Sequence, residues 1–359
     1  MNRSLSQFLV LLLQSVVFWI TAFIIFLMFR YYGVGEEEGI SMTTDLRVPI
    51  SQWFDLGMLL GLVIGVIYAV IETVFEKSIS KKVSLGLGLL LKTIIYLGTL
   101  IISVTFISIL AEDRMDIDLN NDIGWWRTDK TFWMVVLFFL LASLVFSFIK
   151  ISNEKFGRGV FLKMLLGTYR KPKEEKHIFM FLDLKSSTTI AEKLGHIRYS
   201  EFIQDCFYDL NMLIDEYSAQ VYQYVGDEAV LFWPYEKGTL DARCIDLFFA
   251  FQKRLEERKH YYSEKYDWPA EFKAGLHGGM LTIAEVGTIK KELAFHGDVI
   301  NTTARIQNEC NRLNESLLIS DKLLSDIEGL HNYSFSLIGN IDLRGKEEKL
   351  IIQAIRSNK

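Results

Sequence analysis

The chain has 359 residues, of which 50% are hydrophobic and 23% are charged. Its mean hydropathy of +0.21 lies between the values typical of soluble enzymes and of transporters, which indicates one membrane part and one soluble part. A net charge of −5 does not favour a nucleic-acid partner. The three cysteines, Cys206, Cys244 and Cys310, lack CxxC spacing and support neither a disulfide framework nor a zinc cluster.

Four long apolar runs fall within residues 1–151 and predict a four-span transmembrane domain. They extend from Phe8 to Phe29, Trp53 to Phe75, Val83 to Leu110 and Phe132 to Ile151. Each run approaches or exceeds the roughly 20 residues that cross ~30 Å of hydrocarbon. A buried bundle of soluble helices is the alternative, which runs of this length and apolarity disfavour.

The charges of the connecting loops predict the orientation in the membrane. The loops after the first and third runs are acidic, whereas the other flanking segments are basic. The basic residues are Arg3, Lys77, Lys81, Lys82, Lys150, Lys155, Arg158 and Lys163. The positive-inside rule therefore predicts a multi-pass protein of the plasma (inner) membrane with both termini and the soluble half in the cytoplasm.

Few polar residues interrupt the apolar runs. Lys92 lies in the third run and Glu72 near the end of the second. An intramembrane lysine is a functional candidate by default, and the alternative is a side chain that snorkels or pairs with Glu72. The runs lack the Gly-broken half-helices of transporters, so we interpret the region as an anchor or sensor.

Residues 152–176 form a linker with one apolar stripe at helical spacing, which Pro172 ends. Such a helix could pair with a second copy, or it could lie on the inner leaflet as a basic helix. The third region, residues 177–359, has a different pattern.

Short strands and helices alternate in this third region. Strands are predicted over 177–184, 220–224, 229–233, 272–280 and 282–286, and helices over 189–217, 240–262 and about 298–313. The order β-α-β-β-α-β predicts a ferredoxin-like α+β fold, an antiparallel sheet with helices on one face. Residues 316–355 are expected to add strands and one short helix.

Two carboxylates can meet in this fold. Asp183 ends the first apolar strand, and Asp227 lies in the tight turn of the following hairpin. Hard oxygen ligands on rigid elements suit Mg²⁺ or Mn²⁺, with substrate phosphates completing the shell. Two such ions could deprotonate a hydroxyl and neutralise a triphosphate. The alternative is that Asp227 only forms the turn.

Two further segments carry groups that suit a nucleotide. Asn301 and Arg305 share one face of the predicted helix and could bind a sugar and a phosphate, although Arg305 could instead pair with Glu309. The helix that starts after Asp183 offers free N–H groups to phosphate oxygens. Ordinary N-capping by Ser187 or Thr188 is the alternative there.

Four motifs together resemble the catalytic domain of class III nucleotidyl cyclases, over about residues 176–355. They are FLDLKSST at 181–188, YVGDE at 224–228, GLHGG at 275–279 and FHGDVINTTAR at 295–305. The resemblance implies metal-binding aspartates at Asp183 and Asp227. It also implies a ribose-orienting Asn301, a transition-state Arg305 and a triphosphate-binding Lys346.

The nucleotide-binding positions that the resemblance implies are Leu184, Ser186, Ser187, Thr188, Gln223 and Ala294. Gln223 and Ala294 occupy the places that select the base, and they match neither the usual adenylate nor the usual guanylate pair. Glutamine can both donate and accept hydrogen bonds, so it does not identify the purine. Adenine is preferred because it is the commoner substrate of similar bacterial-looking members.

The resemblance further implies a homodimer, in which one copy contributes the aspartates and the other the asparagine and arginine, with two Mg²⁺ or Mn²⁺ ions per site. The predicted function is a membrane-anchored adenylate cyclase that converts ATP to 3′,5′-cyclic AMP and pyrophosphate. The alternatives are a guanylate or other nucleotidyl cyclase and a non-catalytic cyclase-like membrane receptor. A palm-type polymerase is disfavoured by the acidic chain, and a transporter with a regulatory domain by the unbroken spans.

Overall fold

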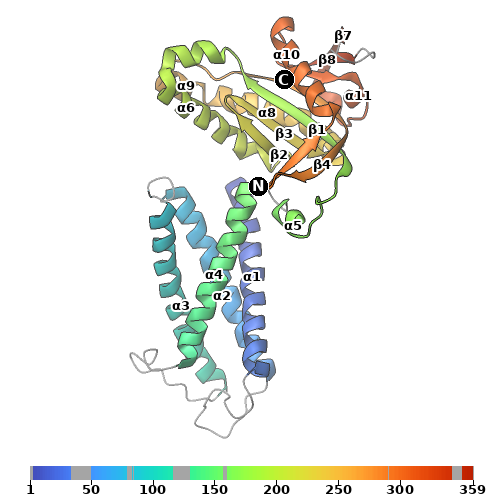
Figure 1. The fold of residues 1–359 in the computed structure, drawn as a ribbon. Helices are drawn as coiled ribbons and strands as arrows, with labels where there is room; N and C mark the ends of the chain where they lie inside the picture. Colours follow the sequence, from blue (N-terminus) through green and yellow to red (C-terminus); the bar gives the residue numbers. More distant parts are fainter. Residues whose placement is uncertain are drawn as a thin grey trace. The chain divides into compact units, whose positions relative to one another are not determined.

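The computed structural model describes residues 3–33, 50–78, 83, 85–115, 130–156, 160–289, 291–341 and 350–358. It divides into two compact units, Met1–Ser152 and Asn153–Lys359 (Figure 1). The first unit consists of four long helices in its described part: α1 (Arg3–Gly33), α2 (Ile50–Ser78), α3 (Leu85–Met115) and α4 (Lys130–Phe156).

Three of these helices contain a stretch long and apolar enough to cross a membrane. The stretches are Phe8–Phe29 in α1, Gly57–Phe75 in α2 and Trp133–Lys150 in α4. In α3 the corresponding stretch among the described residues is shorter, Leu90–Phe106. Three of the four predicted spans therefore meet the length requirement, and the third predicted span, which does not, is also a helix.

Glycines set the approach of α1 to α2. Gly61 and Gly65 face α1, where an added Cβ would come within 2.7 Å of the Ile20 Cα and 2.6 Å of the Val16 Cα. Small residues four apart allow such close contact between membrane helices. This glycine spacing is visible in the sequence, but the search for apolar runs overlooked it.

A buried carboxylate joins three helices of the first unit. Glu72 of α2, which is 1% exposed, accepts hydrogen bonds from Lys92 Nζ (2.8 Å) and Tyr96 OH (2.6 Å) of α3 and from Lys150 Nζ (2.7 Å) of α4. The predicted pairing of Lys92 with Glu72 is confirmed. Lys150 is a further partner, which sequence spacing alone could not assign.

The second unit is built on an eight-stranded sheet whose main path runs β2-β3-β1-β4-β6-β8-β7, with β5 paired to β4. The strands are β1 (Lys173–Leu184), β2 (Gln220–Val225), β3 (Glu228–Pro234), β4 (Phe272–Val286), β5 (Glu292–His296), β6 (Leu317–Ser320), β7 (Tyr333–Ile341) and β8 (Leu350–Ser357). The larger helices are α6 (Ser187–Ile214), α8 (Arg243–Glu257), α9 (Lys259–Tyr266) and α10 (Asp298–Leu313). Shorter helices are α5 (Val160–Leu165), α7 (Tyr235–Thr239) and α11 (Asp321–Leu324).

The first four strands lie antiparallel in the order β2-β3-β1-β4, which confirms the predicted ferredoxin-like core. Three details differ from the prediction. The strands expected over 272–280 and 282–286 are one strand, because β1 starts at the charged residue Lys173 and pairs with β4 as far as Ile283. The helix expected over 240–262 is broken at Arg258 into α8 and α9, and β5 was not predicted.

Alternate residues of β1 face opposite sides of the sheet. Ile178, Met180 and Leu182 are buried in the core formed with α6 and α8. Phe179 and Phe181 face the other side and cluster with Val299 of α10. The two-residue period places Asp183 on this second side, so α10 covers the face of the sheet to which Asp183 belongs.

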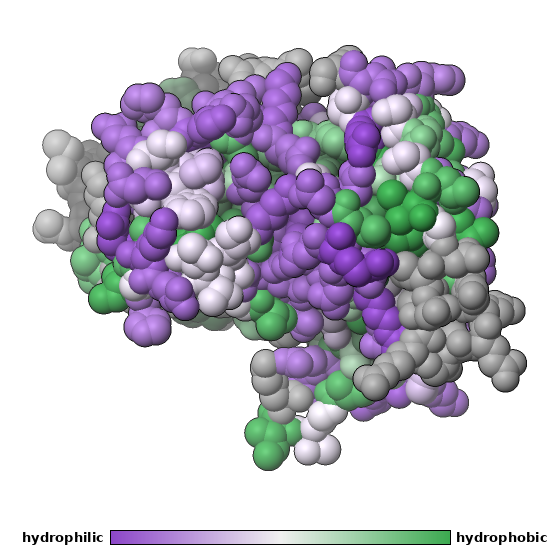
Figure 2. All heavy atoms as spheres, turned by 90° about the horizontal axis from the view of Figure 1, so that it is seen from above, coloured by the Kyte–Doolittle hydropathy of each residue, from purple (hydrophilic) through white to green (hydrophobic). Residues whose placement is uncertain are grey.

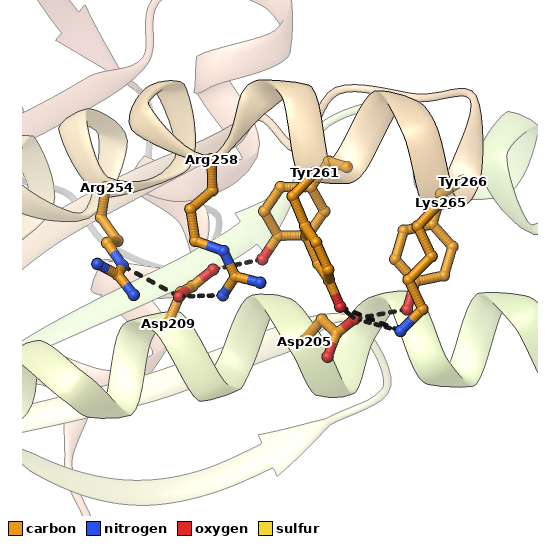
Figure 3. A network of polar contacts seen from close by, with 8 residues as sticks. Asp205, Asp209, Arg254, Arg258, Tyr261, Lys265 and Tyr266 are labelled. Carbon is orange, nitrogen blue, oxygen red and sulfur yellow. Dashed lines mark hydrogen bonds and ion pairs between the residues drawn. The ribbon is translucent and has the colours of Figure 1, made fainter.

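Two aspartates of α6 bind the helical pair α8–α9 (Figure 3). Asp209 is fully buried and accepts hydrogen bonds from Arg254 (3.1 Å) and Arg258 (2.6 Å). One turn earlier, Asp205 accepts one from Lys265 (2.8 Å). Tyrosines of α9 also donate to both carboxylates, so one buried and one partly buried charge, each with several partners, hold α6 against α8 and α9. The face drawn in Figure 2 is largely hydrophilic, with smaller hydrophobic patches.

Candidate active site

Three carboxylates gather where β1 and the β2–β3 hairpin end. Asp183 lies directly opposite Glu228 in the pairing of β1 with β3, and Asp227 precedes Glu228 in the turn. Burial raises the pKa of Asp183, and the charge of Asp227 adds to the shift against the opposing effect of Lys273. Burial, Asp183 and Asp227 raise the pKa of Glu228 to about 7. The structure thus brings the two predicted aspartates together and adds Glu228, which sequence reasoning missed although it follows Asp227 directly.

The donor set fits a hard divalent cation. Mutually repelling carboxylates on rigid strand ends gain from a shared positive charge, and oxygen ligands are those that Mg²⁺ and Mn²⁺ prefer. Within the described part of the chain, no group of three His, Cys, Asp or Glu side chains is arranged to hold a metal ion unaided. Asp183 and Asp227 would therefore need backbone or substrate oxygens to complete a coordination shell.

Two donors hold one oxygen of Asp183. Lys273 Nζ of β4 lies 3.1 Å from Asp183 Oδ2, and Gln307 Nε2 of α10 donates to the same atom at 2.9 Å. Both donor residues are buried, at 5% and 3% exposed. Neither was predicted as a site residue. The sequence does contain a hint for Lys273, because a lysine within the otherwise apolar start of β4 is unusual and indicates a buried acidic partner.

The segment after β1 enters α6 through a strained residue. Ser186 occupies the N-cap position with a left-handed φ of 57° and makes no side-chain capping bond. Ser187 and Thr188 lie inside the helix, so the alternative that one of them is the N-cap is wrong. The side chain of Leu184 is 1% exposed in the core, which leaves only its backbone available to a ligand.

Tyr199 of α6 also reaches the carboxylates. Burial raises its pKa to about 12, the charges of Asp227 and Asp183 add to the shift, and a hydrogen bond with Ser187 opposes it. Tyr199 therefore pairs with the phosphate-binding candidate Ser187 within range of the charges of the two aspartates. No sequence pattern marks Tyr199, because a tyrosine within a helical segment resembles an ordinary core residue.

Helix α10 presents two opposite faces. Its buried residues are Val299, Thr302, Thr303, Ile306, Gln307 and Cys310. At 100° per residue, Asn301 and Arg305 lie 40° apart, and both point away from the centre of that buried arc. Asn301 is exposed, Arg305 is half-buried, and Glu309 bonds to Arg312, not to Arg305. The structure thus places Asn301 and Arg305 next to each other on one face of α10. The opposite face of α10 contacts Asp183.

The predicted base-reading positions lie on two different strands. A bulge between Val221 and Gln223 places Gln223 opposite Val230, on the same side of the sheet as Asp183. Ala294 lies opposite Ala284 in the β4–β5 pair, beside Phe295 but on the other face of the strand. Lys346 is outside the described residues, so its predicted role stays a prediction.

Comparison with known proteins defines the family. Residues 169–354 match the family described as the adenylate and guanylate cyclase catalytic domain, and the chain belongs to this family. Adenylate cyclase 2 from Rhizobium meliloti (strain 1021) is 34% identical over 221 residues, which are 62% of this chain and 61% of that relative. The match therefore spans about three fifths of the relative's length.

Solved structures show the same fold. A bacterial light-regulated adenylyl cyclase is similar with a TM-score of 0.53 at 16% identity, covering 64% of this chain and 66% of that one. A second structure of a bacterial light-regulated adenylyl cyclase has a TM-score of 0.51 at 17% identity, covering 62% of this chain and 64% of that one. The second unit thus carries a nucleotidyl cyclase catalytic domain, with the ferredoxin-like core that its sequence predicts.

Proposed function

We propose that the protein is a membrane-anchored adenylate cyclase that converts ATP to 3′,5′-cyclic AMP and pyrophosphate at a site shared by two copies of the chain. The family match supports a cyclase, and the name of the Rhizobium relative favours adenine. Gln223 and Ala294 leave guanylate cyclase as the second candidate, since neither side chain is specific for one purine.

In the proposed reaction the ribose 3′-oxygen bonds to the α-phosphorus of ATP, and the bond from that phosphorus to the β-phosphate oxygen breaks. The 3′-hydroxyl loses its proton, and pyrophosphate leaves. Asp183 and Asp227 would hold Mg²⁺ or Mn²⁺, which lowers the pKa of the hydroxyl and offsets phosphate charge. We propose that each site binds two such ions.

The remaining roles belong to side chains and backbone groups of the chain. Asn301 would hydrogen-bond the ribose and orient its 3′-oxygen for in-line attack. The Arg305 guanidinium would bind the oxygens of the α-phosphate as their charge grows, because its fork matches two oxygens. Lys346 would bind the leaving phosphates. The N–H groups at Ser186, Ser187 and Thr188, together with the backbone of Leu184, would cradle phosphate oxygens.

One observation carries the two-chain proposal: the opposite faces of α10. Gln307 contacts Asp183 of its own chain, whereas Asn301 and Arg305 point the other way. A second copy with two-fold symmetry would bring its own aspartates to that outer face and form two equivalent sites. Each copy would then be inactive alone.

The surroundings of the catalytic domain are also part of the proposal. The helices of residues 1–151 would anchor the chain in the plasma membrane, with the catalytic domain of residues 177–359 in the cytoplasm, where ATP is available. Residues 152–176 would connect the two, with α5 as a helical part and residues 173–176 as the start of β1. The apolar stretches of α1, α2 and α4 support the anchor.

Incubation of membranes containing the full chain with each of ATP, GTP, CTP and UTP and with Mn²⁺ tests catalysis and base choice together. The expected product is cyclic AMP, and Asp227→Ala should abolish its formation. A cyclic product formed from GTP alone would mean that the protein is a guanylate cyclase. Nucleotide binding without any cyclic product would favour the non-catalytic receptor.

Mixing two inactive variants tests the shared site. One copy carries Asp183→Ala and the other Arg305→Ala, so that only a mixed dimer contains a complete site. We expect each variant alone to be inactive. Each mixed dimer should reach up to half of the wild-type rate, since one of its two sites is intact. Random pairing makes about half of the dimers mixed, so the co-expressed population should reach up to about a quarter of the wild-type rate. Failure of the pair to recover activity would contradict the two-chain arrangement.

A further inference from the structure

We infer that Lys273 and Gln307 are positioning residues that hold the Asp183 carboxylate by one oxygen and present its other oxygen to the bound cation. This inference deepens the proposed function and rests on it. It assigns a role to two residues that none of the four family-like motifs had marked as functional.

The first support is that both donors bind the same atom. Lys273 Nζ and Gln307 Nε2 lie 3.1 Å and 2.9 Å from Asp183 Oδ2. Asp183 Oδ1 accepts no hydrogen bond from the residues that the structure describes. A carboxylate that is fixed at one oxygen loses rotational freedom. Its second oxygen, Asp183 Oδ1, is therefore already oriented toward the cation before the cation binds.

The second support is the rigidity of the two donors. Lys273 lies directly opposite Asp183 in the pairing of β1 with β4, and its side chain is only 7% exposed. The backbone of Gln307 is held because α10 packs closely on β4 at Gly275. The Gln307 backbone lies so near that a side chain at position 275 would not fit. Buried donors with fixed backbones orient a ligand more precisely than exposed ones.

The third support is the charge of the pair. Asp183 lies beside Asp227 and Glu228, and the single ammonium group of Lys273 compensates only part of the negative charge of this cluster. Gln307 adds a hydrogen bond without adding charge. The pair therefore fixes Asp183 while the cluster keeps the negative charge that a divalent cation needs.

The substitution Gln307→Met removes the donor and keeps the size of the side chain. A hydrogen bond to a charged group contributes about 1.5 kcal/mol or more, so the Mn²⁺ concentration for half-maximal activation should rise about tenfold. Lys273→Met removes a donor but also a positive charge that repels the cation, so the uncharged Gln307 gives the cleaner test. A merely structural role would lower the folded fraction and the rate without changing this concentration.

The mixed dimer of Asp183→Ala and Arg305→Ala chains makes the test specific to one chain. Gln307→Met in the copy that keeps Asp183 should raise the half-activating Mn²⁺ concentration about tenfold. In the copy that lacks Asp183, Gln307 has already lost its partner, so the same substitution should shift that concentration less than about twofold.

Equal shifts in both placements, or no shift in either, would overturn the inference. If the co-expressed Asp183→Ala and Arg305→Ala chains were inactive before Gln307→Met is added, the shared site would be contradicted instead. The effect of Gln307→Met on the half-activating Mn²⁺ concentration would then be measured in a chain that retains both Asp183 and Arg305. An unchanged half-activating concentration there would overturn the positioning role. Thermal unfolding of each variant checks that the comparison is made on folded protein.

Discussion

A methyl group at Gly275 should displace α10 from the sheet. The added Cβ would lie 2.4 Å from the Gln307 backbone nitrogen and 2.8 Å from its Cα, and an ordinary contact needs at least 3.4 Å. Because backbone atoms cannot turn aside, α10 must shift by roughly 1 Å in Gly275→Ala. Overpacking of this kind costs about 1–3 kcal/mol of unfolding free energy.

The shift should lower activity as well as stability. Asn301 and Arg305 lie on α10, and a misplacement of about 1 Å in a catalytic group lowers rates by about 10²-fold. Initial rates of cyclic AMP formation and the thermal unfolding midpoint of the purified full chain measure the two effects. Loss of stability with an unchanged rate would show that α10 does not carry catalytic groups.

Gly279→Ala is the matched control, because it lies on the same strand four residues later. Its added Cβ would meet only the Val299 Cγ2 methyl at 3.0 Å, and a side chain can adjust by a few tenths of an ångström. We expect a fall in rate of less than about fivefold for Gly279→Ala. If Gly275→Ala matched this control in rate and midpoint, the close approach of α10 to β4 would be refuted.

Three further predictions concern charged side chains. Asp209→Ala should cost about 3 kcal/mol of unfolding free energy, the low end for a broken buried ion pair, because its arginine partners are partly exposed; denaturant unfolding measures it. Burial raises the pKa of Asp205, but its lysine and tyrosine partners outweigh burial and hold that pKa below the usual range. Asp205 therefore stabilises the fold above pH ~4, and acid titration should show the deficit of Asp205→Asn vanishing below that pH. Glu72→Gln should lower the thermal midpoint in detergent more than Lys92→Met, because the carboxylate also holds Lys150; equal midpoints would contradict this.

Much of the second unit could be predicted because its signals are local. The apolar segment at 177–184, the hairpin turn at Gly226 and the amphipathic helix from Asp298 each follow from side-chain periodicity within one element. Their order then defined the ferredoxin-like core. Asp183 and Asp227 could be paired for the same reason, since strand adjacency brings their positions together.

The missed features depend on contacts between distant elements. Gln307 looks like an ordinary helical residue until α10 is packed on β4, which puts it 2.9 Å from Asp183, 124 positions away in sequence. Lys273 is a cross-strand neighbour of Asp183 only in the observed register. The early start of β1 was hidden by the charged segment 173–176, which pairs with β4 although its side chains are mostly exposed.

In the first unit, too, the local features could be predicted and the contacts between distant helices could not. Length and apolarity predicted its helices, and charge complementarity predicted the Lys92–Glu72 pair, which lies 20 residues apart. Lys150 lies 78 residues from Glu72, and periodicity contains no information about which helices are neighbours.

The most direct test of the account is the stoichiometry of product formation by the purified full chain. With ATP and Mn²⁺, we predict that cyclic AMP and pyrophosphate appear at equal initial rates, and that Asp227→Asn lowers both together by at least 10³-fold, roughly the contribution expected of a cation site. Pyrophosphate release without cyclic AMP, or equal rates in the wild type and Asp227→Asn, would contradict a cyclase that uses these aspartates.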